Sequence, residues 1–384
     1  MSKVKTRIVV ISDTHGAVPY FAPFPLPPGL TPKSIRRPEF SLETKSPFYR
    51  YPLPQADILL HCGNLTLHSD PHEFRQTLQT LRQHPAPLKL FIAGNHDTIL
   101  DKNFTSPFSS AARQKSLLDF EERDRKRVHE LIKDARQSGV YYLTEGSYTF
   151  NLTNGAVFKI YASPWTPRSG RWAFQYEGAH HFDIPNSVDV VMTHGPPWGL
   201  CDAMCDEADG GVGSSSRPKK RAGCKYLLHA IARAKPQLHC FGHIHESWGA
   251  VCGYWADEAA SWAYGPRQRS GALLRRETHA IFDLNWLQAA AEVDGRLLNE
   301  LSRQCGIQLD VTKDRAKMDA MLVNAPIMDS KRKKTQTEDR TKMETVFVNA
   351  SIMDTEHKPT QIPFVIDLDL PEFKRTKMPN ILND

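Results

Sequence analysis

Short runs of apolar, mostly β-branched residues recur along the chain, and longer polar segments separate them. Near-continuous apolar runs of this length are typical of strands that are buried on both faces. The pattern therefore predicts strands at residues 7–12, 57–61, 89–93, 157–162, 188–193 and 237–242.

Amphipathic helical patterns alternate with these runs. Residues 71–83 place Phe74, Leu78 and Leu81 on one face, with Asp70 as the predicted N-cap. Strands that alternate with helices predict a layered α/β domain whose functional residues gather at the carboxyl ends of the strands. Two further helices are predicted at residues 116–137 and 223–234.

Three segments interrupt this alternation. The proline-rich composition of residues 17–55 predicts an irregular insertion. Residues 202–222 are expected to form a flexible loop. Residues 253–342 predict a second insertion, which contains a helical pattern at 286–305. We expect a single domain over residues 1–384 that carries both insertions.

The second insertion contains one copy of an internal repeat. Residues 318–329 are echoed by residues 343–354, and only one copy can occupy a given position in a sheet. Val346 and Phe347 are more β-prone than their counterparts, and Pro326 removes a backbone donor from the first copy. We therefore predict that the second copy forms the strand.

Composition narrows the class of protein. The 384 residues are 40% hydrophobic and 24% charged, which is typical of a globular chain. The formal net charge of +6 is compatible with anionic substrates, but it does not by itself indicate nucleic acid. The odd number of cysteines, seven, favours free thiols in a reducing compartment. We expect a cytoplasmic protein without a membrane span, and the sequence predicts no particular oligomeric state.

Five short polar motifs follow the apolar runs. Each offers oxygen or imidazole groups at the predicted end of a strand, and together these groups predict a centre for divalent metal ions. In chain order the motifs are Asp13-Thr14-His15, Gly63-Asn64, Gly94-Asn95-His96-Asp97, Thr193-His194-Gly195 and Gly242-His243-Ile244-His245.

This series of motifs resembles that of the calcineurin-like metallophosphoesterases, and the likeness is greatest to the small metallophosphoesterase domain-containing proteins. Residues 7–250 and 343–370 carry the resemblance. It implies an αββα sandwich of two mixed sheets flanked by helices. The motifs that point to the smaller group include Ser163-Pro164-Trp165, Thr193-His194-Gly195-Pro196-Pro197, Gly223-Cys224 and Phe347-Val348-Asn349-Ala350.

The resemblance also implies a set of ligands. Asp13, His15 and His245 would hold one divalent ion, and Asn95, His194 and His243 would hold a second, with Mn, Fe or Zn as the expected metals. Residue 64 would bridge the two ions, and His96 would protonate the leaving oxygen. The implied activity is hydrolysis of a small-molecule phosphoric ester, preferably a diester, by in-line attack of a metal-bound hydroxide.

One position departs from the family pattern. The family has Asp at the bridge, whereas this chain has Asn64, which offers one neutral oxygen and an NH₂ group. Two dications that lack a bridging anion repel each other more strongly, so the second metal should bind weakly. Three interpretations remain: a weakened phosphoesterase, a mononuclear or different hydrolase, and a catalytically impaired metal-binding protein that acts through partners.

Other polar residues are candidates for lesser roles. Arg171 follows a strand in a loop and is a candidate for substrate binding, while Asp97 would orient His96 or cap the next segment. Two basic runs, at 217–221 and 331–334, lack the interleaved aromatic residues of a nucleic-acid surface. We interpret them as solvated loop charge.

Overall fold

The structure is a computed structural model that describes residues 2–21, 49–104, 114–204, 220–255, 279–283, 307–311 and 344–373. The predicted helix at 286–305, the first copy of the repeat and most of the proline-rich insertion lie outside these ranges. Among the described residues, no helix is both long and apolar enough to cross a membrane.

Two mixed sheets form the centre of the fold. In the described part of the chain, the first sheet has the strand order β17-β19-β1-β4-β5-β6. Strand β19 runs antiparallel to β1, whereas β1, β4, β5 and β6 are parallel. The bounds are β1 Lys3–Ile11, β4 Ile58–His61, β5 Leu88–Phe91, β6 Val140–Tyr142, β17 Ile307–Asp310 and β19 Phe364–Pro371.

The second sheet has the order β16-β15-β18-β14-β11-β8-β7 over the same described ranges. Strands β18, β14, β11 and β8 are parallel, and antiparallel strands complete both sides. The bounds are β7 Gly146–Asn151, β8 Val157–Ser163, β11 Val190–Thr193, β14 Leu238–Phe241, β15 Gly249–Tyr254, β16 His279–Asp283 and β18 Glu344–Asn349. Short strand pairs lie outside the sheets: β2 Tyr20–Phe21 with β3 Arg50–Tyr51, β9 Thr166–Pro167 with β10 Gln175–Tyr176, and β12 Ala203–Met204 with β13 Lys220–Arg221.

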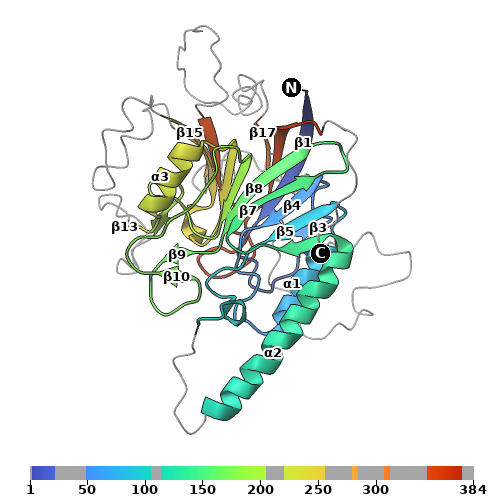
Figure 1. The fold of residues 1–384 in the computed structure, drawn as a ribbon, viewed down its shortest axis with the longest axis vertical. Helices are drawn as coiled ribbons and strands as arrows, with labels where there is room; N and C mark the ends of the chain where they lie inside the picture. Colours follow the sequence, from blue (N-terminus) through green and yellow to red (C-terminus); the bar gives the residue numbers. More distant parts are fainter. Residues whose placement is uncertain are drawn as a thin grey trace, which may run out of the picture.

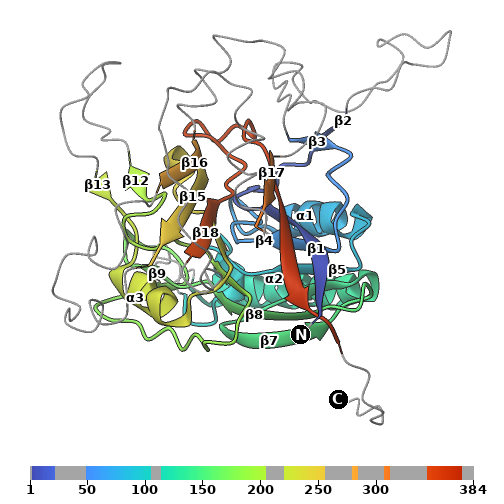
Figure 2. The ribbon, with the colours of Figure 1, turned by 90° about the horizontal axis from the view of Figure 1, so that it is seen from above.

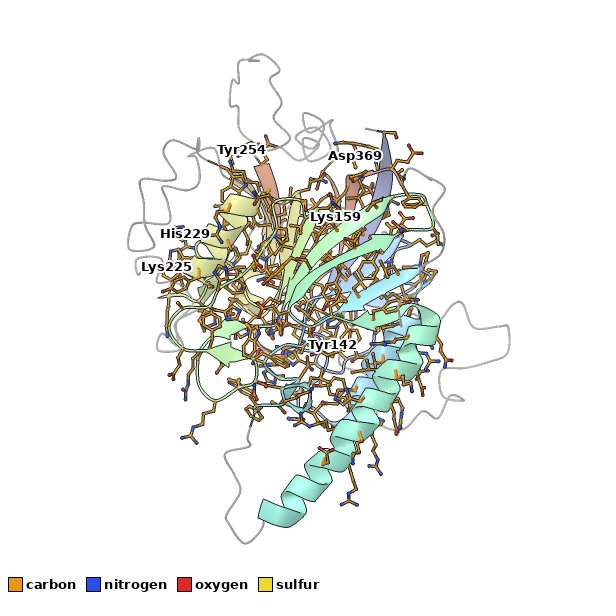
Figure 3. The ribbon with its side chains drawn as sticks, in the orientation of Figure 1. Tyr142, Lys159, Lys225, His229, Tyr254 and Asp369 are labelled. Atoms are coloured by element: carbon orange, nitrogen blue, oxygen red, sulfur yellow. The ribbon has the colours of Figure 1, made fainter. Side chains whose placement is uncertain are left out.

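Helices cover the outer faces of both sheets (Figures 1 and 2). Helices α1 and α2 lie on the first sheet, and α3 lies on the second, with Lys225 and His229 on its outer side (Figure 3). The bounds are α1 Pro71–Gln83, α2 Gln114–Ala135 and α3 Lys225–Ala234, with short 3₁₀ turns η2 Thr98–Leu100, η3 Arg136–Ser138 and η4 His245–Ser247.

Alternation along the strands builds three apolar layers. In β1, Ile8 and Val10 face the core between the sheets, whereas Val9 packs toward α1 and α2. In β11, Val190 joins the central core and Val191 packs toward α3. Strands with both faces buried have continuous apolar sequences, so these strands could be predicted from the sequence. The predicted αββα sandwich of two mixed sheets is confirmed.

Local signals set the helix ends. Asp70 caps α1 by accepting a hydrogen bond of 2.6 Å from the backbone N–H of His72, and Glu73 reaches back to the N–H of Asp70. The predicted helix at 71–83 is confirmed at both ends. After α2 and η3, Gly139 adopts a left-handed φ of 73°, and a Cβ there would lie 2.3 Å from the carbonyl oxygen of Pro87.

The second copy of the repeat forms β18, in the middle of the second sheet between β14 and β15. Val346 and Val348 face the core between the sheets, and Phe347 packs on the side of α3. All three side chains are fully buried or nearly so. The sequence-based prediction for this copy is confirmed.

We expect Phe347→Ala to lower the free energy of unfolding by about 3–5 kcal/mol, because a fully buried aromatic ring is lost. Leu322→Ala, at the equivalent position of the first copy, is the matched control and should change stability by less than about 0.5 kcal/mol. Urea unfolding of both variants checks this. Equal losses would contradict the assignment of β18 to the second copy alone.

Candidate metal centre

The five motifs meet because each follows a strand of the parallel core. Strands β1, β4 and β5 are neighbours in the first sheet, and β11 and β14 are neighbours in the second. Backbone hydrogen bonds join the loops beyond these strands. The N–H of Asp13 donates to the carbonyl of Gly63 at 2.9 Å, and the N–H of Gly242 donates to the carbonyl of His194 at 3.0 Å. Between the sheets, the backbone N–H of His243 donates to Asp13 Oδ2 at 2.9 Å, so the carboxyl ends of both sheets open onto one site.

The loops approach one another so closely that Gly94 and Gly242 leave no room for a side chain. A Cβ on Gly242 would lie 2.0 Å from the Asp13 carboxylate, and one on Gly94 would lie 2.3 Å from the backbone nitrogen of Asn64. Non-glycine residues in the site also adopt left-handed backbone conformations, with φ of 51° at Asp13 and 45° at His15. Such backbone strain concentrates at functional sites.

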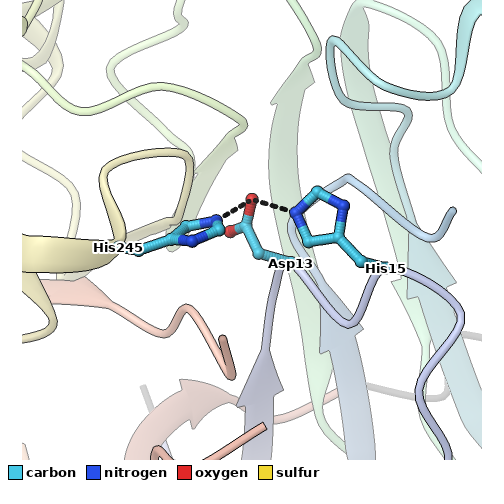
Figure 4. A group of neighbouring side chains, drawn as sticks. All are labelled: Asp13, His15 and His245. Atoms are coloured by element: carbon cyan, nitrogen blue, oxygen red, sulfur yellow. Dashed lines mark ion pairs between the residues drawn. The ribbon is translucent and has the colours of Figure 1, made fainter. Parts of the chain in front are cut away.

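Asp13, His15 and His245 form the first half of the site (Figure 4). Their ligand atoms all lie within 4.8 Å of one another, with Asp13 Oδ1 3.5 Å from His245 Nε2 and 4.0 Å from His15 Nε2. The Nδ1 atoms bond to the carbonyls of Thr66 and Asp354, each at 3.1 Å, so both Nε2 atoms face the carboxylate. His15 Nε2 is buried without a hydrogen-bond partner.

Asn95, His194 and His243 form the second half. Asn95 Oδ1 lies 2.8 Å from His194 Nε2 and 3.0 Å from His243 Nδ1. His194 Nδ1 also faces an acceptor, the carbonyl of Cys62, at 2.9 Å. A neutral imidazole carries one N–H, so it can donate to only one of these two oxygens. A cation between His194 and Asn95 would resolve the conflict.

Burial keeps most of the imidazoles neutral, as metal ligands must be. It lowers the pKa of His194 and brings that of His243 to about 3. Burial is the largest influence on His245 and acts to lower its pKa, but the hydrogen bond and charge of Asp13, the carbonyl of Asp354 and the charge of Glu246 together raise it. Burial acts to raise the pKa of Asp13, yet the hydrogen bond with His245 and the neighbouring imidazoles hold it well below its usual range.

The donor set fits a divalent cation. One buried carboxylate and an imidazole nitrogen without a partner would hold an ion at Asp13, His15 and His245, and neutral nitrogen and oxygen atoms would hold one at the second half. Mixed imidazole and carboxylate ligands suit Zn²⁺, Mn²⁺ and Fe²⁺.

Asn64 lies between the two halves, where the sequence places it, but its amide nitrogen faces them. Nδ2 donates to Asp13 Oδ1 at 2.9 Å and lies 3.3 Å from Asn95 Oδ1. The amide oxygen accepts the backbone N–H of His96 at 2.9 Å. Turning the amide over would set two donors against each other, so this N–H fixes the orientation. Asn64 therefore presents N–H groups, rather than a ligand oxygen, to both halves.

His96 lies at the edge of the centre. Its ring meets that of His15 edge-on, with centroids 4.7 Å apart, and lies against Trp172 at 4.3 Å. Nδ1 bonds to the carbonyl of Leu67 at 2.8 Å, so Nε2 is the nitrogen left for a substrate. Burial lowers the pKa of His96.

Asp97 has a different role from the two predicted for it. Its buried carboxylate accepts the backbone N–H groups of Gly94, Leu65 and Thr66 and the hydroxyl of Thr66. Burial raises its pKa to about 6 in spite of these bonds. Its side chain does not cap η2, and it ties the loop of Asn64 to the loop of Asn95.

Arg171 lies apart from the predicted metal ligands. It is exposed and lines a pocket of about 630 Å³ together with Arg168 and Trp172. Because Trp172 also lies against His96, the pocket adjoins the centre.

Sequence reasoning missed Trp172 and three residues after β18 that contact the centre, because none belongs to a predicted polar motif. The hydroxyl of Ser351 donates to Asp13 Oδ2, the carbonyl of Asp354 faces His245, and the ring of His357 meets that of His15.

The family model of calcineurin-like phosphoesterases matches residues 6–247, and the chain belongs to that family. The family activity is metal-dependent hydrolysis of phosphoesters.

The chain is similar to curated relatives at about 30% identity. Human metallophosphoesterase domain-containing protein 1 is 31% identical over 52% of this chain and 57% of its own length. The probable rhamnogalacturonate lyase C of Emericella nidulans is 30% identical over 52% of this chain and 16% of its own length. The match therefore spans less than two thirds of either relative. A purple acid phosphatase from yellow lupin seeds aligns at a TM-score of 0.31 and 12% identity, over 67% of this chain and 40% of that one.

Mn²⁺ should raise the melting temperature of the wild-type protein, since an ion at about a hundred times its Kd adds about 2.7 kcal/mol. His15→Ala should lose most of this gain because it removes the buried nitrogen that lacks a partner. His129→Ala, on the exposed side of α2, is the control and should keep it. Thermal unfolding with and without Mn²⁺ checks this, and an undiminished gain in His15→Ala would exclude the ligand role.

Proposed function

We propose that the protein hydrolyses phosphodiesters of small molecules in a metal-dependent reaction. The observation that carries this proposal is the convergence of Asp13, His15 and His245 around a buried imidazole nitrogen without a partner. His96 beside this group supplies a proton donor that is outside the ligand set. The preference for diesters over monoesters rests on the family resemblance.

The residues of the chain have separate tasks in such a reaction. Bound divalent ions would supply Lewis-acid charge and activate water. The carbonyls of Thr66 and Asp354 orient His15 and His245, so that their Nε2 atoms stay directed at the reacting group. His96 donates a proton from Nε2 to the leaving oxygen. The anionic phosphoester favours the imidazolium form that this step requires.

The adjoining pocket supports a role for Arg171 in substrate binding. A guanidinium at its rim suits an anionic ester, and the aromatic rings of Trp165 and Trp172 suit an apolar or planar group. Arg168 already pairs with Glu177, so Arg171 is the better candidate of the two.

Asn64 determines how strongly the second ion binds in this proposal. The second half has only neutral donors, and the N–H groups of Asn64 take the place of a bridging anion. We propose one strong metal site, at Asp13, His15 and His245, and one weak site. The same N–H groups also favour a second candidate function, a metal-binding protein with impaired catalysis that acts through partners.

Asn64→Asp should increase the number of bound Mn²⁺ ions toward two and raise turnover of a bis-aryl phosphodiester by at least about tenfold, because electrostatic contacts of this kind are worth about 10²–10³ in rate. Asn151→Asp, the same change at an exposed position of β7, is the matched control. Metal analysis and steady-state kinetics check this. Two bound ions without turnover on any phosphoester would favour the binding protein.

His96→Ala should lower kcat by about 10²–10⁴ because it removes a general acid. The number of bound Mn²⁺ ions should stay at the wild-type value, since His96 is not one of the proposed ligands. Loss of metal from this variant would show that His96 supports the ligands instead.

A further inference from the structure

A turn that follows β18 carries an additional histidine to the mouth of the metal centre. Asp354 builds this turn: its Oδ1 accepts the N–H groups of Glu356 and Lys358, each at 2.9 Å, and its Oδ2 accepts the hydroxyl of Thr360. The carbonyl of Asp354 also accepts the N–H of His357 at 3.1 Å and faces His245 Nδ1 at 3.1 Å. One residue thus orients a proposed ligand and holds His357 beside it.

The backbone of the turn adopts an uncommon conformation that holds His357 near the ligands. The φ of His357, 56°, lies in the left-handed region, which residues with a Cβ seldom adopt. The ring lies edge-on to the rings of His245 and His15, at centroid distances of 5.4 and 5.7 Å. The side chain is exposed, so a substrate can reach it.

His357 stands outside the ligand group. The atoms of Asp13, His15 and His245 lie within 4.8 Å of one another, and His357 does not join this set. No hydrogen bond to its imidazole forms within the described residues. His96 and His357 come from different loops, yet both meet the ring of His15. The opening of the centre is therefore lined by two imidazoles that are not proposed as ligands.

We propose that His357 is a substrate-contacting residue that donates an imidazole N–H to a non-bridging oxygen of the bound phosphoryl group. This inference rests on the proposed function. A phosphoryl group has more oxygens than one strong metal site can hold, and Asn64 brings no charge to the second. A neutral imidazole is sufficient, because one N–H is all the contact requires.

Binding of inorganic phosphate to the Mn²⁺-loaded full-length protein, measured by calorimetry, tests the contact without turnover. His357→Ala should weaken phosphate binding by about tenfold, as expected for one lost hydrogen bond to a charged group. His357→Gln keeps an N–H donor and should restore much of the affinity. His129→Ala should bind phosphate as the wild type does. The number of bound Mn²⁺ ions and the melting temperature should be unchanged in all three variants.

In steady-state kinetics, His357→Ala should have a higher KM for the bis-aryl phosphodiester than the wild type. Its kcat should be reduced less than that of His96→Ala. The proposal would be overturned if His357→Ala bound phosphate within twofold of the wild-type affinity. Loss of Mn²⁺ from His357→Ala would also overturn it, because His357 would then be a metal ligand or the support of one. A wild-type protein that binds phosphate through His357 but hydrolyses no ester would contradict the proposed function and leave this contact in place.

Discussion

The structure depends on one buried carboxylate, that of Asp13. An isolated charge in a protein interior is costly unless it is paired and hydrogen-bonded. Here Oδ2 accepts the backbone N–H of His243 and the hydroxyl of Ser351, and Oδ1 accepts the amide of Asn64. These partners come from both sheets, so satisfying one anion fixes the relative position of the two layers. The close packing of Gly242 on the carboxylate and the left-handed backbone of Asp13 occur at the same place.

The carbonyl groups around the centre contribute as much as the side chains that face it. An imidazole becomes a useful ligand when its other nitrogen is held, because this fixes both its tautomer and the direction of its ring. Backbone oxygens of Thr66, Asp354 and Cys62 hold His15, His245 and His194 in this way. The conformation of the loops therefore controls the protonation of the site, and burial keeps most of its imidazoles neutral.

The sequence predicted the parts of the fold that repeat locally. Apolar runs identified the buried strands β1, β4, β5, β8, β11 and β14, but not β15 or β19. Asp70 with Glu73 marked the start of α1, because this signal lies within a few residues. Strand β7 was missed, since its residues alternate between half-buried and exposed. The motif residues were found because they follow the strands. The orientation of the Asn64 amide was not, because a backbone N–H 32 residues away decides it. Ser351 lies in the second copy of the repeat, where the pattern predicted only a strand, and His357 belongs to no recognised motif.

The position of β18 has a consequence for the order in which the molecule assembles. All six proposed ligands precede residue 250, as do Asn64 and His96, but Ser351 and Asp354, which support Asp13 and His245, follow β18. Strand β18 fills the place between β14 and β15. During synthesis, the ribosome would deliver the complete set of ligands roughly a hundred residues before the strand that closes the sheet around them. Until then the emerging chain would hold Asp13 and His245 without these two supports.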